Sequence, residues 1–310
     1  MKKILTAFLL LFAGITVFSQ DLPFSKLYLF DQTLLNPAIG ARYDFLTVKL
    51  SGSEQWVKLP KNPQTQALSF NMKLKNKMGF NGAILNENYG VVGNTGIKLS
   101  YFYYTKLNTK GDLLSFGISL SAFNYSFNTS ELNPEEIDPA LTGENLSAFI
   151  PNAGLGVYYQ KKDLSLGFSA ANLIPYKPNI FNTDIEPTKT RSYYVYGEYR
   201  FKNEINTFAV VPSVLFNLDE KFNREINLNA KLIFNNAVWL GFSYRDALSG
   251  ETYAIHNFLA IVGFNFFKRL NIAYGYDFGL FSARNVMGGS HNFLVGYNFI
   301  KIDKDVPMYF

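Results

Sequence analysis

The chain has 310 residues, of which only 17% are charged, while Phe and Tyr contribute 30 and 20 residues. A typical soluble domain carries about 25% charged residues and a disordered chain has few aromatic ones, so this composition fits neither class. The sequence contains no cysteine, which excludes disulfides, cysteine-ligated zinc and a thiol nucleophile, and it contains only two histidines. We therefore expect no metal and no cofactor. The net charge of +5 is too small to indicate a nucleic-acid partner.

The first nineteen residues have the pattern of a secretory signal peptide. Two lysines precede an apolar run over residues 4–18, and Val17 and Ser19 occupy the −3 and −1 positions of a cleavage site. An uncleaved anchor is the alternative, although the run is shorter than the ~20 residues of a spanning helix. We expect residues 1–19 to direct export through the Sec pathway. Because no apolar stretch of 18 residues follows, residence in a membrane would require a closed β-barrel.

Residues 20–41 precede the first predicted strand and form a separate segment. Apolar residues recur at helix-like spacing from Leu27 to Leu35, and this pattern stops before Pro37. A short linker helix would explain the spacing. The functional alternatives are a segment that plugs the lumen of a barrel and a segment that docks a periplasmic partner.

Alternation with a period of two residues dominates residues 42–301. From Leu114 to Ala122 the even positions are apolar and mostly large, and the odd positions are Ser or Gly. A soluble β-sandwich also alternates, but its polar face usually carries long charged side chains, whereas here the second face is mostly Gly, Ser, Asn and Ala. An apolar outside and a small, polar inside predict an all-β fold, a transmembrane β-barrel of about 14 antiparallel strands. The predicted strands begin near Asp44, Thr65, Gly79, Thr95, Leu113, Asn152, Leu164, Ser192, Asn206, Glu225, Val238, Ile255, Leu270 and His291.

The predicted connections are alternately short and mostly longer. Those after even-numbered strands are short, and examples of the longer set are 86–93, 128–150, 174–190 and 281–290. Outer-membrane barrels have short periplasmic turns and longer external loops, so the longer set is expected outside the cell. The loop over 128–150 is either a solvated acidic loop or an external loop that docks a partner or covers the lumen. Its acidic residues are Glu131, Glu135, Glu136, Asp138 and Glu144.

A few charged residues fall on the inward-facing positions of their strands. They are Lys98, Glu198, Arg200, Lys231, Arg245 and Asp277. They indicate either an ion-pair network inside the lumen or a selective path for a substrate.

Known catalytic motifs are absent from the sequence, which has no phosphate-binding loop, no GxSxG elbow and no HExxH zinc motif. His256 precedes Asn257, and His291 follows Ser290. Neighbours on a strand point to opposite faces, so Ser290 cannot readily serve as the partner of His291. We expect that the protein is not an enzyme and has no catalytic residue.

Several short motifs follow one another along the chain in a defined order. They are Phe24–Phe30, Leu35–Gly40, Gln55–Trp56, Pro63–Phe70, Gly288–Asn292 and Pro307–Phe310. In this order they resemble the PorP/SprF family of type IX secretion membrane proteins. The resemblance covers the whole chain after residue 19, including a short C-terminal tail over 302–310.

The resemblance implies an outer-membrane component of the type IX secretion or gliding machinery of a Bacteroidetes-type cell. Such a protein would help to export or anchor a large surface adhesin by protein–protein recognition. Implied partners are outer-membrane lipid, the adhesin or its C-terminal domain, and periplasmic lipoprotein or ring components. An outer-membrane diffusion channel or hydrophobic-ligand transporter is the alternative. Candidate partner-binding residues are Phe24, Tyr28, Asn36, Pro37, Gln55, Trp56, Glu135, Glu136, Asp138, Ser290, His291, Tyr309 and Phe310.

Overall fold

The structure is a computed structural model that describes residues 27–74, 77–109, 111–128, 145–174, 190–220, 223–248, 255–280 and 284–299. The predicted signal peptide and the predicted C-terminal tail lie outside these ranges, so both stay predictions. Among the described residues, no helix combines the length and apolar character needed to cross a bilayer.

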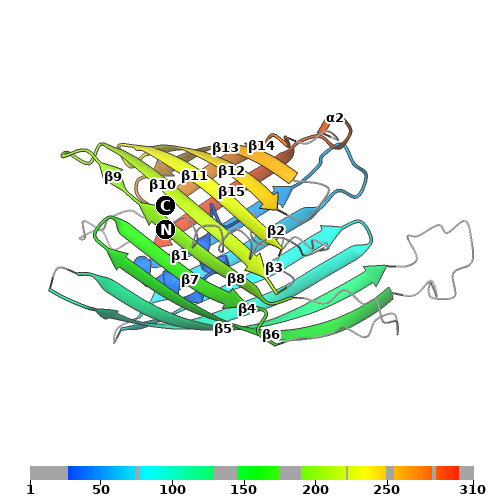
Figure 1. Ribbon diagram of the computed structural model, residues 1–310, viewed down its shortest axis with the longest axis horizontal. Helices are drawn as coiled ribbons and strands as arrows, with labels where there is room; N and C mark the ends of the chain where they lie inside the picture. The colour runs from blue at the N-terminus through cyan, green and yellow to red at the C-terminus, as the bar shows by residue number, and fades with distance from the viewer. Residues whose placement is uncertain are drawn as a thin grey trace, which may run out of the picture.

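A single antiparallel sheet closes on itself to form a barrel (Figure 1). Within the described residues its strands are β1 (Leu46–Glu54), β2 (Gln64–Lys73), β3 (Met78–Tyr89), β4 (Val92–Lys106), β5 (Leu113–Asn128), β6 (Asn145–Lys161), β7 (Leu164–Ala171), β8 (Ser192–Tyr199), β9 (Phe201–Lys202), β10 (Phe208–Asp219), β11 (Arg224–Phe234), β12 (Val238–Leu248), β13 (Ile255–Phe266), β14 (Leu270–Asp277) and β15 (Ser290–Phe299). The first and last strands pair along a seam on which Leu46 faces Phe299 and Glu54 faces His291.

Strands β8 and β9 form one segment of the wall, because both pair with β10 in a continuous register. Glu198 of β8 faces Ser213, and Phe201 of β9 faces Val210. The interruption lies beside Pro212 of β10, which has no N–H group to donate to a neighbouring strand. The described wall is therefore a barrel of fourteen segments, which confirms the predicted fold class.

Side chains alternate between the two faces of the wall as the sequence predicts. On β5, Phe116, Ile118 and Leu120 are exposed on the outside, whereas Ser115 and Ser119 are buried inside. Strands β7, β14 and β15 follow the same rule. The outer face therefore presents a band of large apolar side chains, which suits contact with lipid.

Two predicted loops are shorter than the sequence suggested. The predicted loop Asn86–Gly93 is wrong, because β3 continues to Tyr89 and β4 begins at Val92. Polar residues extend this hairpin, and Asn94 donates to Glu87 at 2.7 Å across the two strands. Strand β6 likewise begins at Asn145, so residues 129–144 alone separate it from β5.

Candidate functional site

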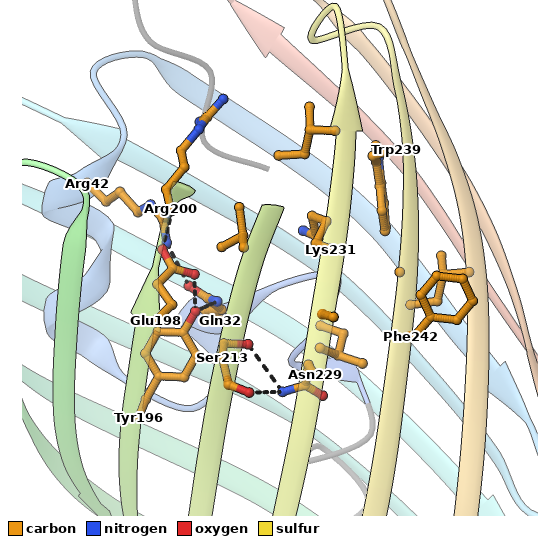
Figure 2. Close-up of a pocket in the computed structure, with 16 residues that line it drawn as sticks. Gln32, Arg42, Tyr196, Glu198, Arg200, Ser213, Asn229, Lys231, Trp239 and Phe242 are labelled. Carbon is orange, nitrogen blue, oxygen red and sulfur yellow. Dashed lines mark hydrogen bonds and ion pairs between the residues drawn. The ribbon is translucent and has the colours of Figure 1, made fainter. Parts of the chain in front are cut away.

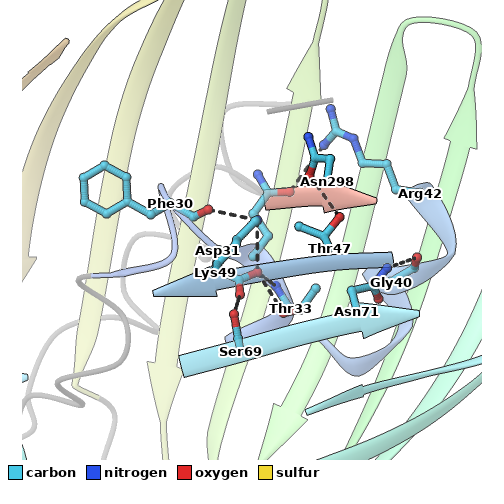
Figure 3. Close-up of polar contacts among 11 residues, drawn as sticks. Phe30, Asp31, Thr33, Gly40, Arg42, Thr47, Lys49, Ser69, Asn71 and Asn298 are labelled. Carbon is cyan, nitrogen blue, oxygen red and sulfur yellow. Dashed lines mark hydrogen bonds and ion pairs between the residues drawn. The ribbon is translucent and has the colours of Figure 1, made fainter. Parts of the chain in front are cut away.

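The N-terminal segment lies inside the barrel (Figures 1 and 3). Its described part forms two 3₁₀ helices, η2 (Gln32–Leu34) and η3 (Pro37–Arg42). Asp31 and Asn36 cap them, since their side chains accept hydrogen bonds from Thr33 N at 3.1 Å and Ala38 N at 2.9 Å. Short 3₁₀ helices replace the regular α-helical spacing that the sequence suggested. The segment therefore enters the lumen as a compact, capped chain.

Apolar contacts hold the first half of this segment. Leu27, Phe30 and Leu34 belong to a buried cluster whose members from the wall include Trp239 and Ile261. The sequence predicted a lumen of small and polar residues, and the structure corrects this by adding an apolar patch on the inner face. Burial of the three side chains removes apolar surface from water and stabilises the segment inside the barrel.

Side chains of the wall donate hydrogen bonds to the backbone of the segment. The donors and accepting carbonyls are Lys49 and Phe30 (3.1 Å), Lys98 and Leu34 (2.8 Å), Asn81 and Pro37 (2.9 Å), Asn71 and Gly40 (3.2 Å), and Lys73 and Ala41 (2.8 Å). These contacts satisfy carbonyls of short helices that would otherwise lack partners. Lys98 faces the lumen, as the sequence predicted, and there it binds the N-terminal segment.

Two glycines of the wall allow the segment to approach its backbone. A Cβ atom on Gly117 of β5 would lie 2.5 Å from Ala38 N, and one on Gly156 of β6 would lie 2.1 Å from Asn36 Oδ1. Real Cβ atoms do not come this close to other atoms. Asn36 also donates to the carbonyl of Val157 at 3.0 Å. The segment is therefore fitted tightly against β5 and β6.

A buried ion pair between Arg42 and Glu198 joins the end of the segment to β8, with 2.5 Å between Nη2 and Oε1 (Figure 2). Tyr196 donates to the same carboxylate, and Gln32 donates to the Tyr196 hydroxyl at 2.6 Å. Burial alone would lower the pKa of Arg42, but Glu198 outweighs burial and raises this pKa well above its usual value. Arg42 is thus a charged anchor that sequence reasoning missed, because it precedes the first predicted strand and alternation assigns no inward face there.

Asp31 is the second charged anchor (Figure 3). Its carboxylate lies 3.5 Å from Lys49 Nζ and accepts hydrogen bonds from Thr33 and Ser69. Burial alone would raise the pKa of Asp31, but Lys49 and these hydrogen bonds outweigh it and hold the pKa below its usual value. The carboxylate is therefore charged at neutral pH and ties the segment to β1 and β2.

We expect Asp31→Asn to destabilise the barrel by about 1.5–3 kcal/mol at neutral pH, because hydrogen bonds to a charged group are lost. Since folding lowers this pKa, the contribution is present above the ordinary value near pH 4 and disappears as the pH falls through the lowered one. Urea unfolding of both proteins at pH 7 and pH 3 measures the difference. A gap of equal size at both pH values would contradict this role for the charge.

Beside the segment, the lumen contains a small cavity of about 40 Å³ (Figure 2). The expected inward charges Glu198, Arg200 and Lys231 line it, together with Tyr196 and Trp239. Arg245 faces the lumen as expected and pairs with Glu225 at 3.3 Å. The ion pairs of Glu198 and Arg245 support the prediction of a charge network inside the lumen. The cavity is nevertheless lined by both cationic and aromatic side chains.

The structure brings two distant motifs together at the rim that carries the longer loops, here called the long-loop rim. Gln55 and Trp56 follow β1 directly, and Ser290 and His291 begin β15, which pairs with β1. Backbone hydrogen bonds continue the contact into the loops, from Val57 N to the carbonyl of Gly289 at 3.2 Å and from Lys58 N to that of Met287 at 3.1 Å. Residues Arg284–Met287 form the short helix α2. Val286 of α2 is 69% exposed, so this junction presents an apolar side chain at the surface.

Ser290 and His291 point to opposite faces of the wall, as the sequence predicted. Ser290 is buried inside, whereas His291 lies on the outer face, where its Nδ1 is 2.6 Å from the Tyr274 hydroxyl. His256 occupies a similar place on β13, 3.2 Å from Asp246. Ser290 and His291 therefore do not form a nucleophile–base pair.

The other candidate partner-binding residues lie in different places. Tyr28, Asn36 and Pro37 are buried in the lumen, and Gln55 is buried beneath the long-loop rim. Phe24, Glu135, Glu136, Asp138, Tyr309 and Phe310 lie outside the described residues. Their roles in partner binding stay predictions.

A closed barrel with an apolar outer band and a segment inside its lumen is an outer-membrane protein. The chain belongs to the family described as "Type IX secretion system membrane protein PorP/SprF", which matches residues 17–297. The predicted family is therefore confirmed, and the protein is an outer-membrane component of type IX secretion. No curated protein matches the sequence.

Solved structures of low sequence identity share the fold. The CymD monoaromatic hydrocarbon channel is 12% identical with a TM-score of 0.58, and the match covers 87% of this chain and 92% of that one. The TodX deltaS2S3 mutant monoaromatic hydrocarbon channel is 11% identical with a TM-score of 0.53, covering 87% and 93%. A Pseudomonas aeruginosa FadL homologue is 10% identical with a TM-score of 0.51, covering 86% and 93%. At this identity the likeness concerns the fold alone.

Proposed function

We propose that this protein holds a large secreted adhesin, or its C-terminal domain, at the cell surface through the long-loop rim. Recognition of another protein would be its whole mechanism, without bond chemistry. The observation that carries the proposal is the junction between β1 and β15, where the motifs Gln55–Trp56 and Ser290–His291 meet below the exposed Val286. Periplasmic lipoprotein or ring components of the secretion system would contact the opposite rim.

The structure of the lumen supports recognition over transport. Backbone contacts, two buried anchors and an apolar cluster fix the N-terminal segment in the lumen. A wide diffusion pore needs an open passage, which this segment narrows. A rigid wall with a filled interior is a suitable support for a binding surface.

We expect Val286→Arg to reduce surface display of the adhesin while bulk type IX secretion and barrel assembly stay unchanged. A charge placed on an apolar contact is costly when the contact is desolvated on binding. Protease accessibility of the adhesin on intact cells, compared with its total amount, measures display. Ile174→Arg is the matched control, since Ile174 is also an exposed aliphatic residue on the long-loop rim but follows β7, away from the junction of β1 and β15. Equal display in both variants would contradict the proposed surface.

A hydrophobic-ligand transporter is the second candidate function. The cavity lined by Val211, Trp239 and Ile261 favours it, and two neighbours in fold are described as monoaromatic hydrocarbon channels. Uptake of a monoaromatic hydrocarbon by vesicles that contain the purified protein tests this candidate. Uptake at the rate of empty vesicles would discard it.

A further inference from the structure

The rim opposite the long loops, here called the short-turn rim, is rich in exposed lysine. Its connections span residues 74–77, 107–112, 162–163, 203–207, 235–237 and 267–269. In these turns and the adjoining strand ends, the exposed lysines of the described chain are Lys77, Lys106, Lys161, Lys162, Lys202 and Lys268. The exposed carboxylates there are Asp44 and Glu204. The rim is therefore a ring of positive charge.

A belt of outward aromatic side chains lies directly next to this ring. Its members near the short turns are Tyr103, Tyr199, Phe201, Phe208, Phe234, Phe266, Tyr297 and Phe299, each exposed on the outside of the wall. Aromatic belts of this kind mark the level at which the hydrocarbon core of a bilayer meets the headgroups. The belt therefore locates the periplasmic boundary of the hydrocarbon core on this barrel.

Distances along the chain place the lysines at the level of the phosphates. Lys106 follows Tyr103 by three residues, and Lys268 follows Phe266 by two. A strand rises ~3.3 Å per residue and is tilted by about 40°, so three residues rise roughly 8 Å along the bilayer normal. The headgroup layer on each side of the core is about 5–8 Å thick. The ammonium groups thus reach the depth of lipid phosphates.

We propose that the short-turn rim binds the headgroups of anionic phospholipids in the periplasmic leaflet. Exposed apolar side chains at the tips of the same turns support this choice of partner. Phe267 is 93% exposed, Ile205 75% and Leu107 53%, and each has a lysine within three residues in the chain. Alternating apolar and cationic side chains suit an interface that offers both acyl chains and phosphates. The inference rests on the outer-membrane location and is independent of the proposed adhesin binding.

The test uses the full purified protein in nanodiscs of equal parts phosphatidylglycerol and phosphatidylethanolamine. Native mass spectrometry counts the lipids that stay bound to the protein after the protein is released from the nanodisc. We expect the wild type to retain phosphatidylglycerol in about threefold excess or more, and to lose this excess when salt shortens the screening length from ~10 Å to ~3 Å. The triple variant Lys106→Gln, Lys161→Gln and Lys268→Gln should retain both lipids nearly equally.

A matched triple variant on the long-loop rim serves as the control. Lys58→Gln, Lys61→Gln and Arg191→Gln remove three positive charges from that rim, and this variant should keep the preference of the wild type. Heat-modifiable migration in gels checks that every variant is folded. Equal retention of the two lipids by the wild type, or equal loss of preference in both triple variants, would overturn the proposal. If the wild type retained both lipids equally, the lysines of the short-turn rim would instead be expected to bind an acidic protein surface.

Discussion

Gly117→Val is expected to displace the N-terminal segment, so that the blocked lumen of the barrel becomes a conducting channel. The new Cβ atom would lie 2.5 Å from Ala38 N and 2.6 Å from Pro37 C, both backbone atoms that cannot rotate aside. Overpacking of this kind costs about 1–3 kcal/mol, so the segment shifts and the donors Asn81 and Lys98 lose their carbonyl acceptors. Single-channel recording in planar bilayers should show a steady current that the wild type lacks.

The control is Gly197→Val, a glycine on the outer face of β8. A Cβ atom there would lie 3.6 Å from Leu166 Cδ2 and 3.8 Å from Val214 Cγ1, which are ordinary contacts. This variant should show no more single-channel current than the wild type and should be equally stable. If Gly117→Val were equally quiet and equally stable, the close fit of the segment against β5 would not be what closes the lumen.

Arg42→Ala is expected to destabilise the folded barrel by about 3–5 kcal/mol, the usual cost of removing one partner from a buried ion pair. The side chains of Arg42 and Glu198 are 7% and 8% exposed, so water cannot replace the lost partner. Tyr196 would remain as a hydrogen-bond donor, but it carries no charge to balance the carboxylate. Urea unfolding in detergent micelles, followed by heat-modifiable migration in gels, measures the loss.

A second ion pair provides the comparison for this prediction. Lys202 and Asp163 are 3.1 Å apart, with side chains 45% and 24% exposed, so Lys202→Ala should cost at most about 1 kcal/mol. In a double-mutant cycle, Arg42→Ala and Glu198→Ala together should cost less than the sum of the single variants. An additive result would mean that the two residues stabilise the barrel independently of each other.

The wall was predictable from the sequence because membrane strands carry a strict period of two. Alternation from Leu114 to Ala122 fixes which residues face lipid, and this alone assigns the faces of β5. Loop lengths were less predictable. Asn86–Gly93 looks like a loop because it is polar, but its residues pair across a hairpin and hydrogen-bond to one another.

The interior was much harder to predict than the wall. Alternation places Lys98 and Lys231 on the inward face, but it does not show which inward residues meet. Arg42 and Asp31 acquire their roles only when η2 and η3 are folded against the wall. Glycines such as Gly117 fit the small-residue pattern of any lumen, and only the position of Ala38 reveals why a side chain is excluded there.

Pairing of the first strand with the last also bears on the order of assembly. The N-terminal segment precedes β1, and the cylinder cannot be sealed until β15 has arrived. Three of the lysines that donate hydrogen bonds to the segment belong to the early strands β1, β2 and β4, namely Lys49, Lys73 and Lys98. These strands can therefore bind the segment before the barrel is complete. Glu198 of β8 joins later. The segment can thus act as an internal template that guides the curvature of the sheet as it assembles. A chain that lacks the segment would have to form the curved sheet without these contacts.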